Sequence, residues 1–220
     1  MISKRLDIIY KLVKKNSIVA DVGCDHGLLI SKLALDNIIY KGYATDVNIK
    51  PLNQARKTID KYHLHDKIKL ILCNGLESIP NDTNCFIIAG MGYETCKSIL
   101  ENDLDKIKNA NQIIVQVNRD VNKLRKWISD HNFTIINEDI VLDGHYYQAI
   151  EFNTCYHENY SEEEIEYGIY LHSDIYYKYL RDKLNKYLNI YNSIDNIEKK
   201  QLLMKHINMI NAILIKKEDA

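Results

Sequence analysis

The chain has 220 residues, of which 46% are hydrophobic and 27% are charged, a balance typical of a globular protein that buries a core. Its formal net charge of −1 excludes binding of nucleic acid by bulk positive charge, so any such site has to be a local basic patch. No stretch approaches the ~18 consecutive apolar residues of a membrane span, and the five cysteines lack CxxC or zinc-like spacing. These features predict a cytoplasmic protein with reduced thiols, no bound metal and no membrane segment.

Strands and helices are predicted to alternate from Ser3 to residue 131. Short apolar runs that end in an acid or a glycine are typical of strands, and apolar residues at three- and four-residue spacing are typical of helices. Such alternation indicates a mostly parallel sheet with helices on both faces. The predicted strands span 17–23, 40–46, 68–73, 85–89 and 112–117, and the predicted helices span 28–35, 48–62, 93–100 and 121–131, after a short first helix that Ser3 caps.

The pattern changes after this alternation. Two strand-like runs, 133–142 and 146–152, are separated by Asp143-Gly144-His145, and Asp-Gly between such runs is typical of a β-hairpin. A doubly wound sheet that closes with a hairpin resembles the Rossmann-like fold of methyltransferases that use S-adenosylmethionine (SAM). We therefore expect an α/β protein of this fold class.

The remainder of the chain is predicted to be helical. Ser161 precedes three glutamates and has the form of a capping box. Two later segments carry apolar and tyrosine residues at alternating three- and four-residue spacing, with a polar stretch around 192–196 between them. This spacing predicts an antiparallel helical hairpin with coiled-coil-like packing. We expect two domains, a SAM-dependent methyltransferase domain at 1–155 and a helical hairpin at 156–220 that is an appendage to it.

The first candidate for a ligand site is the segment Ala20-Asp-Val-Gly-Cys-Asp-His-Gly27. A glycine just past a strand lets the backbone turn tightly and approach a ligand closely. The dinucleotide fingerprint GxGxxG is incomplete here, because Asp25 stands where its second glycine would be. A carboxylate there repels a pyrophosphate and suits the ammonium and sulfonium of SAM. The alternative is an ordinary junction between a strand and a helix.

Three further strand ends carry similar signals. Asp46 follows the second strand by the spacing at which an acid binds ribose hydroxyls, although it could instead be an acid at a helix start. Glycine-containing loops follow the third and fourth strands, and in methyltransferases the loop after the third commonly contacts adenine. The predicted cofactor site comprises Gly23, Asp25, His26, Gly27, Asp46, Val47, Asn74, Gly75, Leu76, Ala89, Gly90, Met91 and Gly92.

The order of these motifs resembles the bacterial tRNA (adenine-22-N1) methyltransferase family, called TrmK. The resemblance covers about residues 2–152, and its most specific parts are Asp25-His26 and Gly90-Met91-Gly92. This chain departs from the family pattern at Tyr93, where a second glycine is usual, at Val117, where proline is usual, and at Gly27, where another small residue is more frequent. Further matching segments are Ile2–Leu6, Asp21–His26, Asn74–Glu77, Ile88–Gly92, Gln116–Asn118, Leu124–Trp127, Glu138-Asp139 and Gly144–Ile150.

The resemblance implies methyl transfer from SAM to N1 of a tRNA adenine. N1 has an available lone pair, so the reaction needs alignment and exclusion of water more than a general base, and none is assigned. Asp25, Gln116 and Asn118 are the candidates for holding the adenine, with His26 and Tyr147 as secondary candidates. The alternatives are that His26 caps a helix, that Gln116 and Asn118 only finish a strand, and that Tyr147 packs in the core.

Two groups of basic residues are candidates for contacts with RNA phosphates. A solvated helix face is the alternative for both groups, and a helix interface is the alternative for the tyrosine-rich tail. The groups are Lys4, Arg5, Lys11, Lys14 and Lys15 near the N-terminus and Lys178, Arg181, Lys183 and Lys186 in the tail.

Several functions remain open from the residues alone. A SAM-dependent methyltransferase of a small molecule and a non-catalytic RNA-binding protein with the same fold both compete with the tRNA enzyme. An NAD oxidoreductase is disfavoured by the absent GxGxxG. We expect a monomer with SAM as its cofactor and tRNA as its partner.

Overall fold

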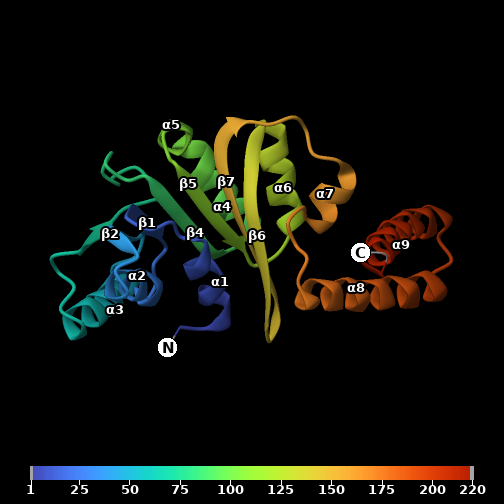
Figure 1. The fold of residues 1–220 in the computed structure, drawn as a ribbon, viewed down its shortest axis with the longest axis horizontal. Helices are drawn as coiled ribbons and strands as arrows, with labels where there is room; N and C mark the ends of the chain where they lie inside the picture. Colours follow the sequence, from blue (N-terminus) through green and yellow to red (C-terminus); the bar gives the residue numbers. More distant parts are fainter. Residues whose placement is uncertain (1, 219–220) are drawn as a thin grey trace.

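A seven-stranded sheet forms the centre of the computed structural model, which describes residues 2–218 (Figure 1). Met1, Asp219 and Ala220 of the two expected domains lie outside this described part. The strand order is β3-β2-β1-β4-β5-β7-β6, with β1 to β5 parallel and β7 antiparallel to both neighbours. The strands are β1 (Ser17–Val22), β2 (Ile39–Asp46), β3 (Ile68–Leu72), β4 (Cys85–Met91), β5 (Gln112–Val117), β6 (Phe133–Asp143) and β7 (His145–Tyr156).

Helices cover both faces of this sheet. Along β4, Cys85 and Ile87 point into one apolar cluster, whereas Phe86 and Ile88 point into the other, because side chains alternate across a strand. The first cluster also contains residues of α1 (Lys4–Leu12), α2 (Leu28–Leu35) and α3 (Ile49–Lys61). The second contains residues of α4 (Tyr93–Asn102), α5 (Leu104–Lys108) and α6 (Val121–Asp130). The predicted doubly wound sheet that closes in a hairpin is thus confirmed.

The helix starts agree with the sequence in most places. Ser3 caps α1 by accepting a hydrogen bond from Leu6 N, and Ser161 forms the predicted capping box with Glu164. Asn48 occupies the N-cap of α3 but makes no side-chain cap bond. The short helix α5 was not predicted, because its five residues are too few to show a helical period.

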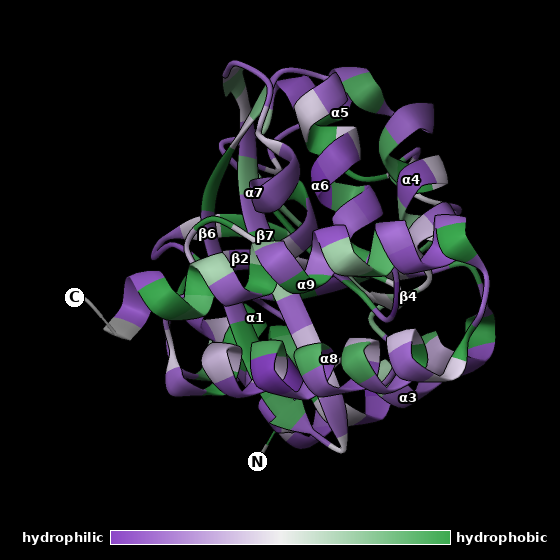
Figure 2. Ribbon diagram, turned by 90° about the vertical axis from the view of Figure 1, so that its right-hand side faces the viewer, coloured by the Kyte–Doolittle hydropathy of each residue, from purple (hydrophilic) through white to green (hydrophobic). Residues whose placement is uncertain are grey.

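Three helices follow the sheet: α7 (Glu162–Tyr167), α8 (Asp174–Ser193) and α9 (Ile197–Glu218). The predicted helical hairpin corresponds to α8 and α9, which pack together in front of the sheet in Figure 2. A third apolar cluster joins these helices to the sheet, because Ile140 of β6 packs with Tyr176, Leu180 and Ile210. Within residues 2–218, no helix combines the length and the apolar character needed to cross a membrane.

The expected domain division near residue 155 remains a prediction. β7 continues to Tyr156, and α7, which lies beyond that position, packs against α6. The helices after residue 156 therefore include one that packs against α6 and two that form the hairpin, referred to below as the tail (α8 and α9).

Candidate active site

The candidate site lies at the carboxyl ends of β1, β2 and β4. Parallel pairing aligns Val22 of β1 with Thr45 of β2 and Ile88 of β4, so the loops after these strands leave the same edge of the sheet. Gly23 turns directly after β1 with φ +72°, a conformation that other residues adopt only with strain. Its N–H and that of Cys24 both donate to the Thr45 carbonyl at 2.9 Å, which ties the first turn to the end of β2.

A cavity of about 630 Å³, called the first cavity here, opens beside this turn. Asp46 stands at its wall, and Asp46 Oδ1 accepts a hydrogen bond of 2.8 Å from Asn48 N. The acid thus lines the cavity and also holds the start of α3, so the two interpretations of Asp46 are compatible. The predicted cofactor residues that line the first cavity are Gly23, Asp46, Val47, Asn74, Gly75 and Met91.

Other lining residues of the first cavity were missed by sequence reasoning. Half of them lie on α4 at positions that share one helix face, and this mostly polar stripe behind a glycine loop was the signal that could have found them. The missed residues are Val22, Thr45, Cys73, Glu77, Glu94, Thr95, Ser98, Ile99, Asn102 and Asp103.

A second cavity of about 240 Å³ lies on the other side of Gly23. Met91 marks the boundary, because its Cε would lie only 2.2 Å from a Cβ added to Gly23. The positive φ therefore favours glycine, and a Cβ at this position would displace the methyl end of the flexible Met91 side chain. The residues that line the second cavity are Arg5, Leu6, Asp21, Gly23, Cys24, Asp25, His26, Leu28, Leu29, Ala89 and Gly90.

Two acidic residues, Asp21 and Asp25, line the second cavity. Asp25 has φ +49° and a side chain that is 74% exposed, and its Oδ1 lies 3.6 Å from His26 Nε2. Asp21, by contrast, is buried, and burial raises the pKa of its carboxyl to about 7. Asp21 was part of the recognised motif but was not predicted as a site residue. A cation in this cavity would be attracted by both carboxylates.

His26 is exposed beside Asp25 and does not cap the next helix. The N-cap of α2 is Gly27, which makes no side-chain cap bond, and the His26 carbonyl accepts a hydrogen bond of 2.8 Å from Thr58 Oγ1. Gly27 itself is buried against Ala55. Gly27 thus does not line the second cavity, whereas its neighbours Asp25 and His26 do.

Two other predicted cofactor residues lie away from the first two cavities. Leu76 is fully buried in the apolar core, and its N–H donates to Asp103 Oδ2 at 3.2 Å. Gly92 is the N-cap of α4. In both loops the cavity is lined by the preceding residues instead, Asn74 and Gly75 in one loop and Met91 in the other.

A third cavity of about 620 Å³ adjoins the second, and the two share Arg5 and Gly90. Tyr147 lines it and is half-buried, with its ring centroid 5.7 Å from Arg5 Cζ. Tyr147 is thus part of a cavity wall and not of the core. The residues that line the third cavity are Arg5, Gly90, Asn118, Arg119, His145 and Tyr147.

Gln116 organises the boundary between the second and third cavities without lining either. Its side chain is fully buried, and Oε1 accepts hydrogen bonds from Gly90 N at 3.2 Å and Arg5 Nη1 at 3.1 Å. Asn118 Nδ2 donates to the Gly90 carbonyl at 2.7 Å, and Gln116 Nε2 donates to Asn118 Oδ1 at 3.4 Å. Gln116 was predicted to hold the adenine. In the structure, its side chain supports the wall that Arg5 and Gly90 form.

The remaining basic residues of the N-terminal group are distributed differently. Lys11 pairs with Asp7 at 2.7 Å and Lys14 pairs with Glu151 at 3.1 Å, whereas Lys4 and Lys15 are exposed. Arg5 is half-buried between two cavities. Lys4, Lys11, Lys14 and Lys15 are thus exposed, two of them paired with acids, and their contact with RNA stays a prediction.

The basic residues of the tail show a similar division. Lys183 Nζ lies 5.1, 5.4 and 5.8 Å from the ring centroids of Tyr167, Tyr179 and Tyr187, so its charge faces aromatic rings within the helical packing. Lys178, Arg181 and Lys186 are exposed. Among residues 2–218, no cluster of three or more side chains suited to hold a metal ion is present.

Comparisons with known proteins give the class of this site. The methyltransferase domain family matches residues 2–150, and the chain belongs to this family. TrmK of Mycoplasma capricolum, solved in complex with S-adenosyl-homocysteine, is 35% identical, with 97% of each chain covered and a TM-score of 0.84. Within the methyltransferases, the chain accordingly belongs to the TrmK family.

Two further relatives are similar to this chain. A Streptococcus pneumoniae protein solved in complex with S-adenosyl-L-methionine is 29% identical, with 97% of this chain and 100% of that chain covered and a TM-score of 0.87. The tRNA (adenine(22)-N(1))-methyltransferase of Bacillus subtilis is 28% identical over 151 residues. That match spans 68% of this chain and 63% of the relative's length.

The support that Gln116 gives to the site can be tested through stability. We expect Gln116→Leu to lower the free energy of unfolding by about 1–3 kcal/mol, because Gly90 N and Arg5 lose a buried acceptor. Urea denaturation measures the change. Gln201→Leu, on the exposed surface of α9, is the matched control and is expected to change the free energy by less than about 0.5 kcal/mol. Equal stability of the two variants would contradict the role given to Gln116.

Proposed function

We propose that this protein transfers the methyl group of SAM to N1 of an adenine in tRNA, at position 22 as in the Bacillus subtilis relative. The observation that carries the proposal is the row of three adjoining cavities at the sheet edge, in which Gly23 separates the first from the second and Arg5 and Gly90 separate the second from the third. A nucleoside, an amino-acid group and a target base each need one such space.

The donor sets of the first two cavities fit the two halves of SAM. Asp46 offers a carboxylate to ribose hydroxyls in the first cavity, and Asn74 and Gly75 offer polar backbone and side-chain groups to the adenine. In the second cavity, Asp21 and Asp25 suit the ammonium and Arg5 suits the carboxylate of the methionine part. SAM supplies an electrophilic methyl group bound to a positively charged sulfur.

The third cavity is our candidate for the target adenine. Its residues can hold the base so that the N1 lone pair points toward Gly90 and the second cavity, and Tyr147 offers a ring for stacking. As N1 gains the methyl group, the electron pair of the broken bond returns to sulfur and the adenine ring becomes cationic. No proton has to leave N1 before attack, so the residues align the base and exclude water and need no general base.

Binding to tRNA in the cytoplasm, by a monomer, is part of the same proposal. Because the net charge is −1, contact with RNA phosphates depends on exposed basic side chains such as those of Lys4, Lys178 and Arg181. The open wall of the third cavity, with Arg119 and His145, favours a large substrate over a fully enclosed small molecule.

The direct test is methyl transfer itself. Protein incubated with labelled SAM and unmodified tRNA is expected to place the label on N1 of one adenine, and Asp25→Ala is expected to lower incorporation roughly tenfold or more, because a carboxylate near the cationic cofactor is lost. Mapping of the methyl group measures both results. Asp195→Ala, an exposed acid between α8 and α9, is the control. Label found on no RNA would reject the proposed function, and unchanged incorporation by Asp25→Ala would remove Asp25 from the site.

Gly23 provides a test of the cofactor position. We expect Gly23→Ala to weaken SAM binding by roughly tenfold or more, because the added methyl group displaces the Met91 side chain, which lines the first cavity. Gly144→Ala is the matched control, since Gly144 has a similar φ of +75° but open space around its Cβ position. Both variants carry the backbone strain of about 1–2 kcal/mol. Calorimetric titration with SAM separates the two effects, and equal loss of affinity in both variants would count against the assignment.

Asp21 predicts that cofactor binding depends on pH. With a pKa of about 7 in the free protein, Asp21 is protonated below this pH, whereas the ammonium of SAM favours the carboxylate. Binding should therefore release a proton below pH 7, and affinity should rise with pH until Asp21 is ionised, by up to about tenfold per pH unit. Calorimetry between pH 6 and 8 measures the slope, which Asp21→Asn is expected to flatten. A slope that persists in Asp21→Asn would assign the proton to another group.

A further inference from the structure

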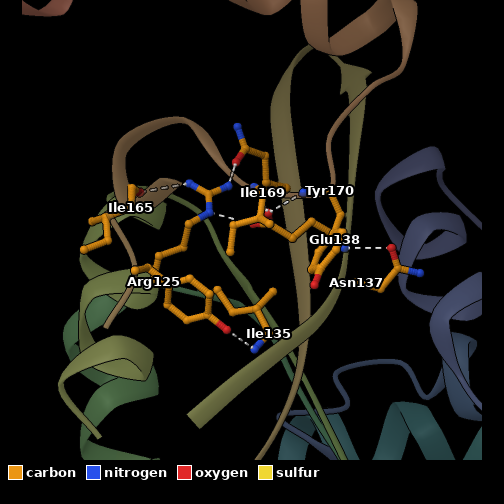
Figure 3. Close-up of polar contacts among 9 residues, drawn as sticks. Arg125, Ile135, Asn137, Glu138, Ile165, Ile169 and Tyr170 are labelled. Carbon is orange, nitrogen blue, oxygen red and sulfur yellow. Dashed lines mark hydrogen bonds and ion pairs between the residues drawn. The ribbon is translucent and has the colours of Figure 1, made fainter. Parts of the chain in front are cut away.

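A buried ion pair connects the sheet to the tail. Arg125 of α6 donates from Nε to Glu138 Oε1 of β6 at 2.6 Å, and the two side chains are 1% and 0% exposed (Figure 3). Arg125 Nη2 also donates to Gln148 Oε1 of β7 at 2.6 Å. A buried pair of this kind fixes geometry more than it adds stability, because both charges lose their hydration. The pair therefore fixes α6 relative to both strands of the hairpin.

The second carboxylate oxygen of this pair holds the segment that leads into α8. Glu138 Oε2 accepts hydrogen bonds from Ile169 N at 2.6 Å and Tyr170 N at 3.4 Å (Figure 3). Gly168 precedes them with φ +96°, and a Cβ there would lie 3.0 Å from both Arg125 Nη2 and Glu138 Oε2. The backbone between α7 and α8 is thus pressed directly against the ion pair.

A second contact joins the tail to the tip of the β6–β7 hairpin. Tyr146 OH of β7 donates to Asp182 Oδ2 of α8 at 2.6 Å, and burial together with Asp182 raises the pKa of Tyr146 to about 12, so the hydroxyl keeps its proton. In the same strand, Tyr147 lines the third cavity and Gln148 accepts from Arg125. Three consecutive residues of β7 therefore contact the tail, the cavity and the ion pair.

Exposed positive charges flank this second contact. Lys178 and Lys186 lie four residues before and after Asp182, so the three share one stripe of α8. Both lysines are exposed, and among the described residues neither forms an ion pair. Lysines of α9 differ, because Lys205 and Lys216 pair with acids of α7. The exposed basic residues of α8 that form no ion pair within residues 2–218, Lys178, Arg181 and Lys186, thus lie on or beside the stripe that contacts the hairpin tip, whereas Lys199 of α9 is a further exposed lysine elsewhere in the tail.

We propose that Glu138 and Tyr146 are positioning residues that hold the Lys178–Lys186 stripe at a fixed distance from the third cavity, so that the tail selects which nucleotide of the RNA enters. The inference rests on the proposed function, because it takes tRNA as the substrate. Phosphate contacts fix the register of a nucleic acid without reading its sequence. When the phosphate contacts lie at a fixed distance from the third cavity, the register of the RNA determines which of its bases reaches the cavity.

The experiment compares two RNA substrates, a full tRNA and a stem–loop that contains the target adenine but is too short to reach α8. Tyr146→Phe and Asp182→Ala each remove the hydrogen bond between Tyr146 and Asp182. Glu138→Gln replaces one of the two accepting carboxylate oxygens by an amide NH2 group, which cannot accept. Asp182→Glu, which retains a carboxylate, tests rescue. Asp130→Asn, which removes the exposed pair with Lys126 on α6, is the control that changes an ion pair without touching the tail.

We expect the KM for full tRNA to rise roughly fivefold to twentyfold in the three disrupting variants, whereas kcat at saturating tRNA, the Kd for SAM and the KM for the short RNA stay within about twofold. Methylation at neighbouring adenines should increase, and Asp182→Glu should recover part of the loss. A merely stabilising role would lower Tm without this split between the two RNAs. If Glu138→Gln does not fold, the Tyr146 and Asp182 variants decide the question.

The result that overturns the inference is an unchanged KM for full tRNA in the folded variants, or an equal rise for both RNAs. Wild-type protein that methylates neither RNA overturns the proposed function and the inference together. Wild-type protein that methylates tRNA, with variants that behave like Asp130→Asn, overturns the inference alone.

Discussion

Gln116 Oε1 accepts one hydrogen bond from Gly90 N and another from Arg5 Nη1 inside a fully buried position. These two bonds fix the end of β4 and the start of α1 relative to each other, and both groups form the wall shared by the second and third cavities. A buried amide whose partners are all protein groups holds one geometry, because any other arrangement would leave polar atoms unsatisfied. The relation between the second and third cavities therefore depends on a residue that lines neither.

The fold could be predicted from the sequence because its main determinants are local. The apolar strands, the Ser3 and Ser161 caps and the Asp143-Gly144 turn each carry a signal within a few residues. The sheet edge followed from the rule that parallel strands end together, which placed Gly23 and Asp46 in one site. What could not be predicted was short or non-local, such as the five residues of α5.

The site was harder to predict because side-chain direction decides it. Loop residues that were assigned together separate in the structure, since Asn74 lines the first cavity while Leu76 turns into the core. Arg5 was expected to contact RNA phosphates, yet it meets Gln116, which is 111 residues away in the chain. No local pattern encodes such a pairing, because it arises only when α1 packs beside β5 and β7. Sequence spacing therefore located the cavities but not the hydrogen bonds between them.

The same distinction applies to charge. The sequence counts Lys11 and Lys183 among the basic residues near the candidate RNA surface, but Lys11 is paired with Asp7 and Lys183 faces tyrosine rings. A net charge of −1 is compatible with phosphate binding because paired charges contribute little field beyond a Debye length of about 8 Å. The charges left free on α8 are positioned by the buried Arg125–Glu138 ion pair and by the hydrogen bond between Tyr146 and Asp182. For the proposed function, the location of a few unpaired lysines relative to the third cavity therefore matters more than their number.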